Sequence, residues 1–120
     1  MQLPSSDIIG KWQVINYKYS SEQLLTDEML ANARALALTT VYTFNGLDNN
    51  SIKTGSITNE TGVKNFSWTS RGSSLALNEW KVKTYVEFYF IDSSNLKLIY
   101  SKKIKGKARP EVQIFSLKKQ

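Results

Sequence analysis

Apolar and polar residues alternate along most of this 120-residue chain, in short runs separated by turn-forming residues. Such a period of two is typical of strands that turn one face toward a core. The clearest run is Lys81–Ile91, in which one face carries Val82, Thr84, Val86, Phe88 and Phe90. The other face carries Lys81, Lys83, Tyr85, Glu87 and Tyr89. We therefore predict a strand here, with the first set turned inward.

The N-terminal run, Ile8–Tyr19, is apolar on both faces and predicts a bent strand. Its two faces are Trp12 with Val14, and Ile15 with Tyr17 and Tyr19. A strand of this kind can bury one end inside a barrel and the other beneath a helix.

A helix is predicted next, over about Ser21–Ala35, where alanine and leucine recur at helical spacing. Two N-terminal signals are present. Ser20 and Gln23 fit a capping box, and Thr26 followed by two acidic residues offers a second start. The helix is therefore predicted with a possible break near Thr26.

Seven further strand-like runs follow the helix, separated by turns rich in Gly, Asn, Asp and Ser. They are Ala37–Asn45, Ser51–Thr58, Val63–Ser70, a run through Leu75 and Leu77, Lys81–Ile91, a run through Leu96, Leu98 and Tyr100, and Glu111–Leu117. With the first run they make eight strands joined by short connections. We predict a mainly β fold, an eight-stranded antiparallel up-and-down barrel with a short helical insert after the first strand, as one domain over residues 1–120. A barrel of this size is either filled by its own side chains or holds one small ligand, and the pattern leaves both open.

The chain has no cysteine and no histidine, which narrows its chemistry. Disulfides, thiolate metal sites, cysteine nucleophiles and serine–histidine–acid triads are excluded. Glu79 and Glu87 are the acids of one predicted strand pair, but no base, nucleophile and oxyanion donor can be assembled around them. We expect no enzyme, no metal site and no cofactor. No apolar run reaches the roughly 18 residues that a transmembrane helix needs.

Charge is uneven along the sequence. Residues 1–96 carry eight Lys/Arg against nine Asp/Glu, whereas residues 97–120 carry eight against Glu111 alone. This basic segment either keeps exposed strands soluble or attracts an acidic partner, through Lys102, Lys103, Lys105, Lys107 and Arg109. We do not expect nucleic acid as a partner, because aromatic residues do not alternate with these lysines as they do in single-strand binding proteins.

Several segments resemble one known family. Gly10-Lys11-Trp12 opens the first strand, and Val41-Tyr42-Thr43-Phe44-Asn45-Gly46 combines a Tyr-x-Phe strand with a polar-glycine turn. With the helical insert and later segments such as Phe66-Ser67-Trp68, the chain resembles the small bacterial lipocalin-like domains, and more distantly the calycins. The resemblance covers nearly the whole chain. It implies an exported bacterial protein, periplasmic or associated with the outer membrane.

The resemblance also implies structural and binding roles. Gly10 and Trp12 would close one end of the barrel, with Arg109, or else Lys107, stacked on the indole as a cation. The inward residues would bind a small apolar ligand; the candidates are Tyr42, Phe44, Phe66, Trp68, Thr84, Val86, Phe88, Phe90, Leu98 and Tyr100. The alternative is a protein-interaction module that uses its basic C-terminal face around a filled barrel core.

Overall fold

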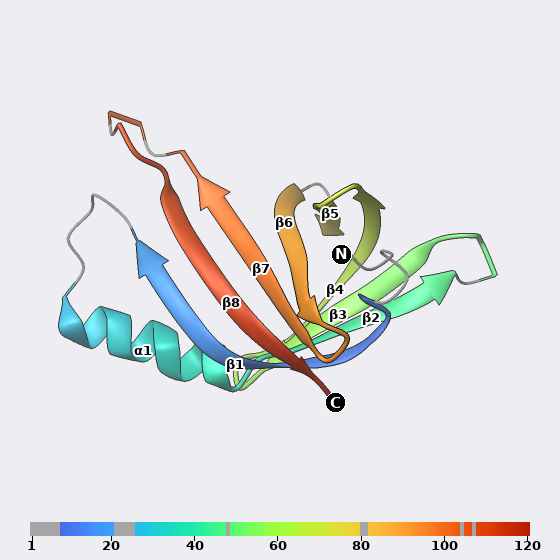
Figure 1. Cartoon of the computed structure of the whole chain (residues 1–120), viewed down its shortest axis with the longest axis horizontal. Coiled ribbons are helices and arrows are strands. Elements are labelled where there is room, and N and C mark those ends of the chain that lie inside the picture. Colours follow the sequence, from blue (N-terminus) through green and yellow to red (C-terminus); the bar gives the residue numbers. More distant parts are fainter. Residues whose placement is uncertain (1–7, 21–25, 48, 80–81, 104, 107) are drawn as a thin grey trace.

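The computed structural model describes residues 8–20, 26–47, 49–79, 82–103, 105–106 and 108–120. In it, eight antiparallel strands pair in chain order, and the last pairs with the first to close a barrel (Figure 1). One helix follows the first strand. The predicted fold class, a closed up-and-down barrel of eight strands with a short helical insert, is confirmed.

The elements have the following bounds: β1 Gly10–Ser20, α1 Asp27–Leu38, β2 Val41–Leu47, β3 Lys53–Asn59, β4 Gly62–Arg71, β5 Ser74–Glu79, β6 Val82–Asp92, β7 Asn95–Lys102 and β8 Glu111–Lys119. We call the end of the barrel with α1 and the β3–β4, β5–β6 and β7–β8 connections the open end. The opposite end, where β1 begins and β8 finishes, is the closed end.

The helix begins at the second of the two predicted signals. The Thr26 hydroxyl accepts a hydrogen bond of 3.1 Å from the backbone N–H of Met29, and Asp27 and Glu28 occupy the first turn. Gln23 of the first predicted cap lies outside the described residues. The helix continues to Leu38, so the predicted end at Ala35 and the predicted strand start at Ala37 are wrong. Leucine and alanine favour helix strongly enough to prolong it until Thr39 caps its end.

A β-bulge in β1 changes the predicted faces of that strand. Against β8, the register moves from Val14 opposite Leu117 to Asn16 opposite Ser116, so Ile15 is the extra residue. Because the bulge interrupts the alternation, Tyr17 is buried on the same side as Trp12, while Ile15 is exposed. The prediction that Tyr17 shares a face with Ile15 is therefore wrong, although the predicted bend is present.

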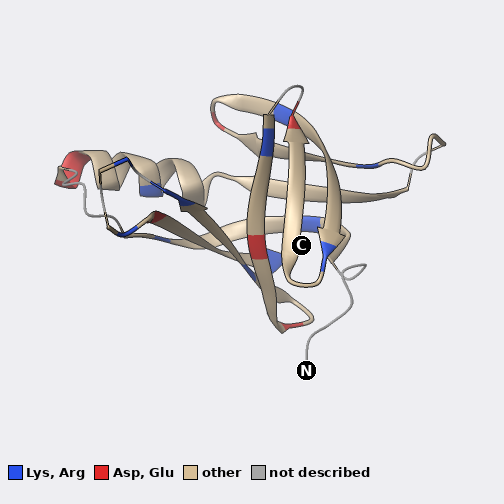
Figure 2. Ribbon diagram, turned by 90° about the horizontal axis from the view of Figure 1, so that it is seen from above, with Lys and Arg blue, Asp and Glu red and all other residues tan. Residues whose placement is uncertain are grey.

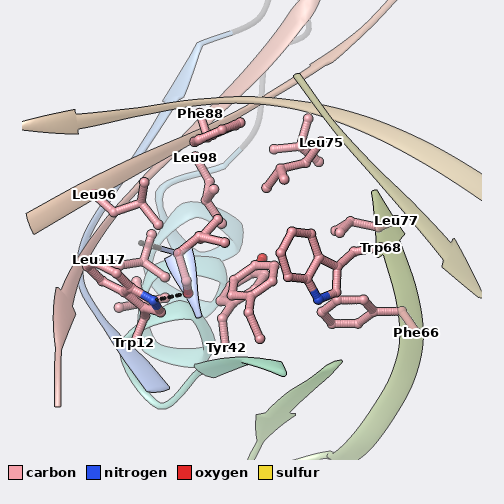
Figure 3. Packing of buried hydrophobic residues seen from close by; sticks show 14 of the residues in the cluster. Trp12, Tyr42, Phe66, Trp68, Leu75, Leu77, Phe88, Leu96, Leu98 and Leu117 are labelled. Carbon is pink, nitrogen blue, oxygen red and sulfur yellow. Dashed lines mark hydrogen bonds between the residues drawn. The ribbon is translucent and has the colours of Figure 1, made fainter. Parts of the chain in front are cut away.

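Trp12 seals the closed end of the barrel. Its indole is completely buried, and its N–H donates a hydrogen bond of 2.7 Å to the carbonyl oxygen of Ile8 (Figure 3). The cation over the ring is Lys119, with Nζ 5.5 Å from the ring centroid. Arg109 was predicted there, but it is exposed in the β7–β8 connection at the open end. Antiparallel pairing explains this, because Trp12 lies opposite the last residues of β8 and not its first. Lys107, the other predicted cation, lies outside the described residues.

Aromatic rings fill the middle of the barrel. Phe44 makes edge contacts with Phe66 and Trp68, at centroid distances of 5.7 and 5.5 Å. The Trp68 indole N–H donates to the carbonyls of Thr54 and Asn45. The middle of the barrel is thus a packed core of aromatic side chains.

Candidate ligand-binding pocket

The strands separate at two places at the open end. β1 pairs with β2 only from Gly10 to Gln13, and its second half pairs with β8 alone. β6 pairs with β7 only from Glu87 onward, which leaves the start of β6 apart from the end of β7. Figure 1 shows α1, the second half of β1 and the β7–β8 hairpin on the same side of the molecule. This splaying makes room inside the mouth of the barrel.

A pocket of about 500 Å³ occupies this room. Its volume falls within the range of about 300–1,000 Å³ that is usual for small-molecule sites. Its lining combines apolar, hydroxyl, amide and charged side chains: Tyr42, Ile57, Asn59, Thr61, Gly62, Val63, Lys64, Leu77, Glu79, Thr84, Tyr100, Gln113 and Phe115. A smaller cavity of about 220 Å³ lies beneath α1 and shares residues such as Tyr42, Ile57 and Phe115 with the first. The space therefore extends from the barrel mouth to the inner side of the helix.

A buried tyrosine, Tyr42, and a half-buried one, Tyr100, are hydrogen-bonded to each other at the pocket. The hydroxyl groups of Tyr42 and Tyr100 lie 2.8 Å apart and share a hydrogen bond. Burial raises the pKa of Tyr100 to about 12, and the negative charge of Glu79 contributes to this rise. Burial raises the pKa of Tyr42 well above its ordinary value, with further contributions from Tyr100 and Glu79. Both hydroxyls are thus neutral at physiological pH. One O–H donates within the pair, and the other can donate a hydrogen bond to a further acceptor.

The tyrosine pair predicts a loss of stability in strong base. Below pH 10 both hydroxyls are protonated in the folded and unfolded chains, and their contribution is fully present. Between pH 10 and about 12 the unfolded chain ionises at Tyr100 while the folded chain keeps its proton, so unfolding becomes easier as pH rises. For Tyr100 alone the loss is about 2 kcal/mol by pH 12. The free energy of unfolding measured by urea titration from pH 9 to 12 checks this.

The matched control replaces both tyrosines at once, Tyr42→Phe with Tyr100→Phe. Removing both hydroxyls leaves no unpaired partner, so the double variant is expected to fold. Its free energy of unfolding should fall less between pH 10 and 12 than that of the original chain. Equal falls in the two proteins would show that the pair is not the source of the alkaline loss.

The predicted ligand-binding residues fall into two groups. Tyr42, Thr84 and Tyr100 line the pocket. The other seven belong to the packed core or lie against it: Phe44, Phe66, Trp68, Val86, Phe88, Phe90 and Leu98. Inward orientation is common to both groups, and what separates them is their distance from the open end.

Several residues of the pocket lining were not predicted from the sequence. Glu79 continues the inward alternation of Leu75 and Leu77, and Gln113 and Phe115 continue that of Leu117. This two-residue period was a usable signal for all three. Ile57 lies in a polar run whose alternation is too weak to indicate its role.

Comparison with known proteins adds no family to these observations. No family model, curated protein or solved structure matches the chain. What the structure establishes is an architecture consistent with the calycins: a closed eight-stranded antiparallel barrel with a helix after the first strand. Among the described residues, no helix has the length and apolar character to cross a membrane.

The basic segment of the sequence is divided in space. Four of the residues predicted to attract an acidic partner are exposed in the β7–β8 hairpin at the open end: Lys102, Lys103, Lys105 and Arg109. Lys107 lies outside the described residues. Lys118 and Lys119 lie at the closed end of β8, and Figure 2 shows basic positions over the length of the molecule. An acidic partner at the hairpin stays a prediction.

Proposed function

We propose that this chain is a non-catalytic, lipocalin-like binding protein that holds a small amphiphilic molecule in the open end of its barrel. The observation that carries the proposal is the pocket of about 500 Å³ between the splayed strands. It supports a ligand with an apolar body, because Ile57, Leu77 and Phe115 provide apolar walls. It also supports a polar group on that ligand, because the tyrosine hydroxyls lie in the same space.

The binding free energy expected for a simple alkyl alcohol is sufficient for this site. Each methylene that leaves water for an apolar wall gains about 0.8 kcal/mol. A ten-carbon alcohol therefore has enough apolar surface to bind measurably, even after it loses translational freedom. Its hydroxyl oxygen can accept a hydrogen bond from the tyrosine O–H that is not used within the pair. Decanol is thus a suitable neutral probe.

The test fills the pocket with a larger side chain. Thr84 lines the pocket from the inner face of β6, and the neighbouring Tyr85 is exposed on the outer face. We expect Thr84→Trp to weaken decanol binding at least about tenfold, since the indole occupies the space of the ligand. Tyr85→Trp, which adds an indole outside the barrel, is expected to leave the affinity unchanged.

Isothermal titration calorimetry with decanol measures both variants, and thermal unfolding shows that each is folded. If the original chain binds no decanol, the proposed function is wrong. It is also wrong if Thr84→Trp binds decanol as tightly as Tyr85→Trp does, because the ligand would then lie elsewhere.

A further inference from the structure

The pocket contains a carboxylate for which the described residues show no side-chain partner. Glu79 follows Leu75 and Leu77 on the inner face of β5 and is half-buried where it lines the pocket. No hydrogen bond or ion pair joins it to another side chain within the described part of the chain. A half-buried charge is stabilised by a nearby opposite charge, and among the described residues of the pocket lining the one cation is the exposed Lys64.

The electrostatic field of Glu79 reaches the two tyrosine hydroxyls of the pocket. Its negative charge acts on both Tyr42 and Tyr100, where it raises the pKa of each hydroxyl. A second negative charge placed beside these hydroxyls would be repelled by Glu79 and by the same burial that keeps them neutral. A positive charge would be attracted, and the aromatic side chains of Tyr42, Tyr100 and Phe115 are among the lining residues that it would meet.

Lys64 is the other charged residue of the lining. Its side chain is exposed, so water and salt screen its ammonium group more strongly than they screen the half-buried Glu79. The groove between β6 and β7 also carries charges, Lys83, Lys102 and Glu111, and it opens next to the pocket. All three belong to that groove and not to the lining of the pocket. The charge that dominates inside the pocket is therefore negative.

We propose that the pocket selects cationic amphiphiles, with the ammonium head at Glu79 and the apolar chain against Ile57, Leu77 and Phe115. This inference rests on the proposed function and names its ligand class. It also distinguishes this pocket from one that binds fatty acids, because Glu79 would repel the carboxylate head of a fatty acid.

Three probes with the same chain length test the selectivity: decylamine, decanol and decanoate, each titrated by calorimetry at pH 7 and below its micelle concentration. We expect decylamine to bind about tenfold more tightly than decanol, and decanoate about tenfold more weakly. The preference for decylamine should shrink as salt is added, since part of it comes from one ion pair.

Glu79→Gln assigns the preference to one residue. It should bring the affinity of decylamine to within about twofold of that of decanol measured on the same variant. Glu87→Gln is the matched control, because Glu87 is an exposed acid on the outer face of β6 and its replacement changes net charge equally. That control should keep the full preference.

The outcomes separate the two proposals. If decanol binds but decanoate binds as tightly as decylamine, or more tightly, the cationic selectivity is wrong and the proposed function stands. If Glu79→Gln and Glu87→Gln lower the decylamine preference equally, Glu79 is not the recognising group and the inference fails. If none of the three probes binds, both proposals fail together.

Discussion

Trp12→Ala is expected to lower the free energy of unfolding by about 3–5 kcal/mol. The indole is completely buried between strands that begin and end the barrel, and alanine would leave a cavity in place of its two rings. The carbonyl of Ile8 would also lose its hydrogen-bond donor. Domains of this size have only about 5–15 kcal/mol of stability in total, so this single change removes a large part of it. Urea unfolding followed by circular dichroism measures the loss.

The control for this prediction is Tyr85→Ala. It removes an aromatic side chain that is 66% exposed on the outside of the barrel, so we expect a change within about 0.5 kcal/mol. If Trp12→Ala costs no more than Tyr85→Ala, the indole does not seal the barrel, and the account of the closed end is wrong.

Gly55→Ala is expected to cost about 2–3 kcal/mol or more. A methyl group at this position would lie 2.4 Å from the carbonyl oxygen of Thr43 and 2.6 Å from the ring of Phe66. The carbonyl belongs to the backbone and cannot turn away. The ring is packed against Phe44 in the core, so it can move only at the expense of that contact. Chemical unfolding of the variant checks the prediction.

Gly46→Ala is the matched control, because it makes the same change in the neighbouring strand. There the added methyl group would meet only the side chain of Ile9, at an ordinary contact distance of 3.6 Å. Since alanine reduces the freedom of the unfolded chain, we expect this variant to be neutral or more stable by about 0.4–1 kcal/mol. Similar losses in both variants would mean that strand flexibility, and not close packing over Gly55, requires glycine.

The order of the strands could be predicted from the sequence because its signals are local. Turn residues separate the runs, and the Thr26 hydroxyl caps the helix within three residues of itself. The bulge at Ile15 could not be predicted in this way. It is an extra residue only relative to β8, which lies about 100 positions further along the chain. The cation over Trp12 was assigned wrongly for the same reason, since the pairing register selects Lys119.

The pocket could be predicted only in part. Alternation indicates that Thr84 and Phe88 both point inward from β6, but it carries no information on depth. Thr84 lines free space while Phe88 is packed, because β6 separates from β7 before Glu87. That separation depends on how far two strands stay paired, which is a property of the closed barrel and not of either strand. Glu79 continues the inward alternation of β5, but that alternation does not show that its side chain borders free space.

The most direct test of a ligand site at the open end is to locate a bound molecule by nuclear magnetic resonance. Decanol added to isotope-labelled protein should give intermolecular Overhauser contacts to the methyl groups of Ile57 and Leu77, which line the pocket. It should give none to those of Leu96 and Leu117, which are buried near Trp12 at the closed end. Contacts confined to the closed end or to the outer surface of the barrel would contradict the account.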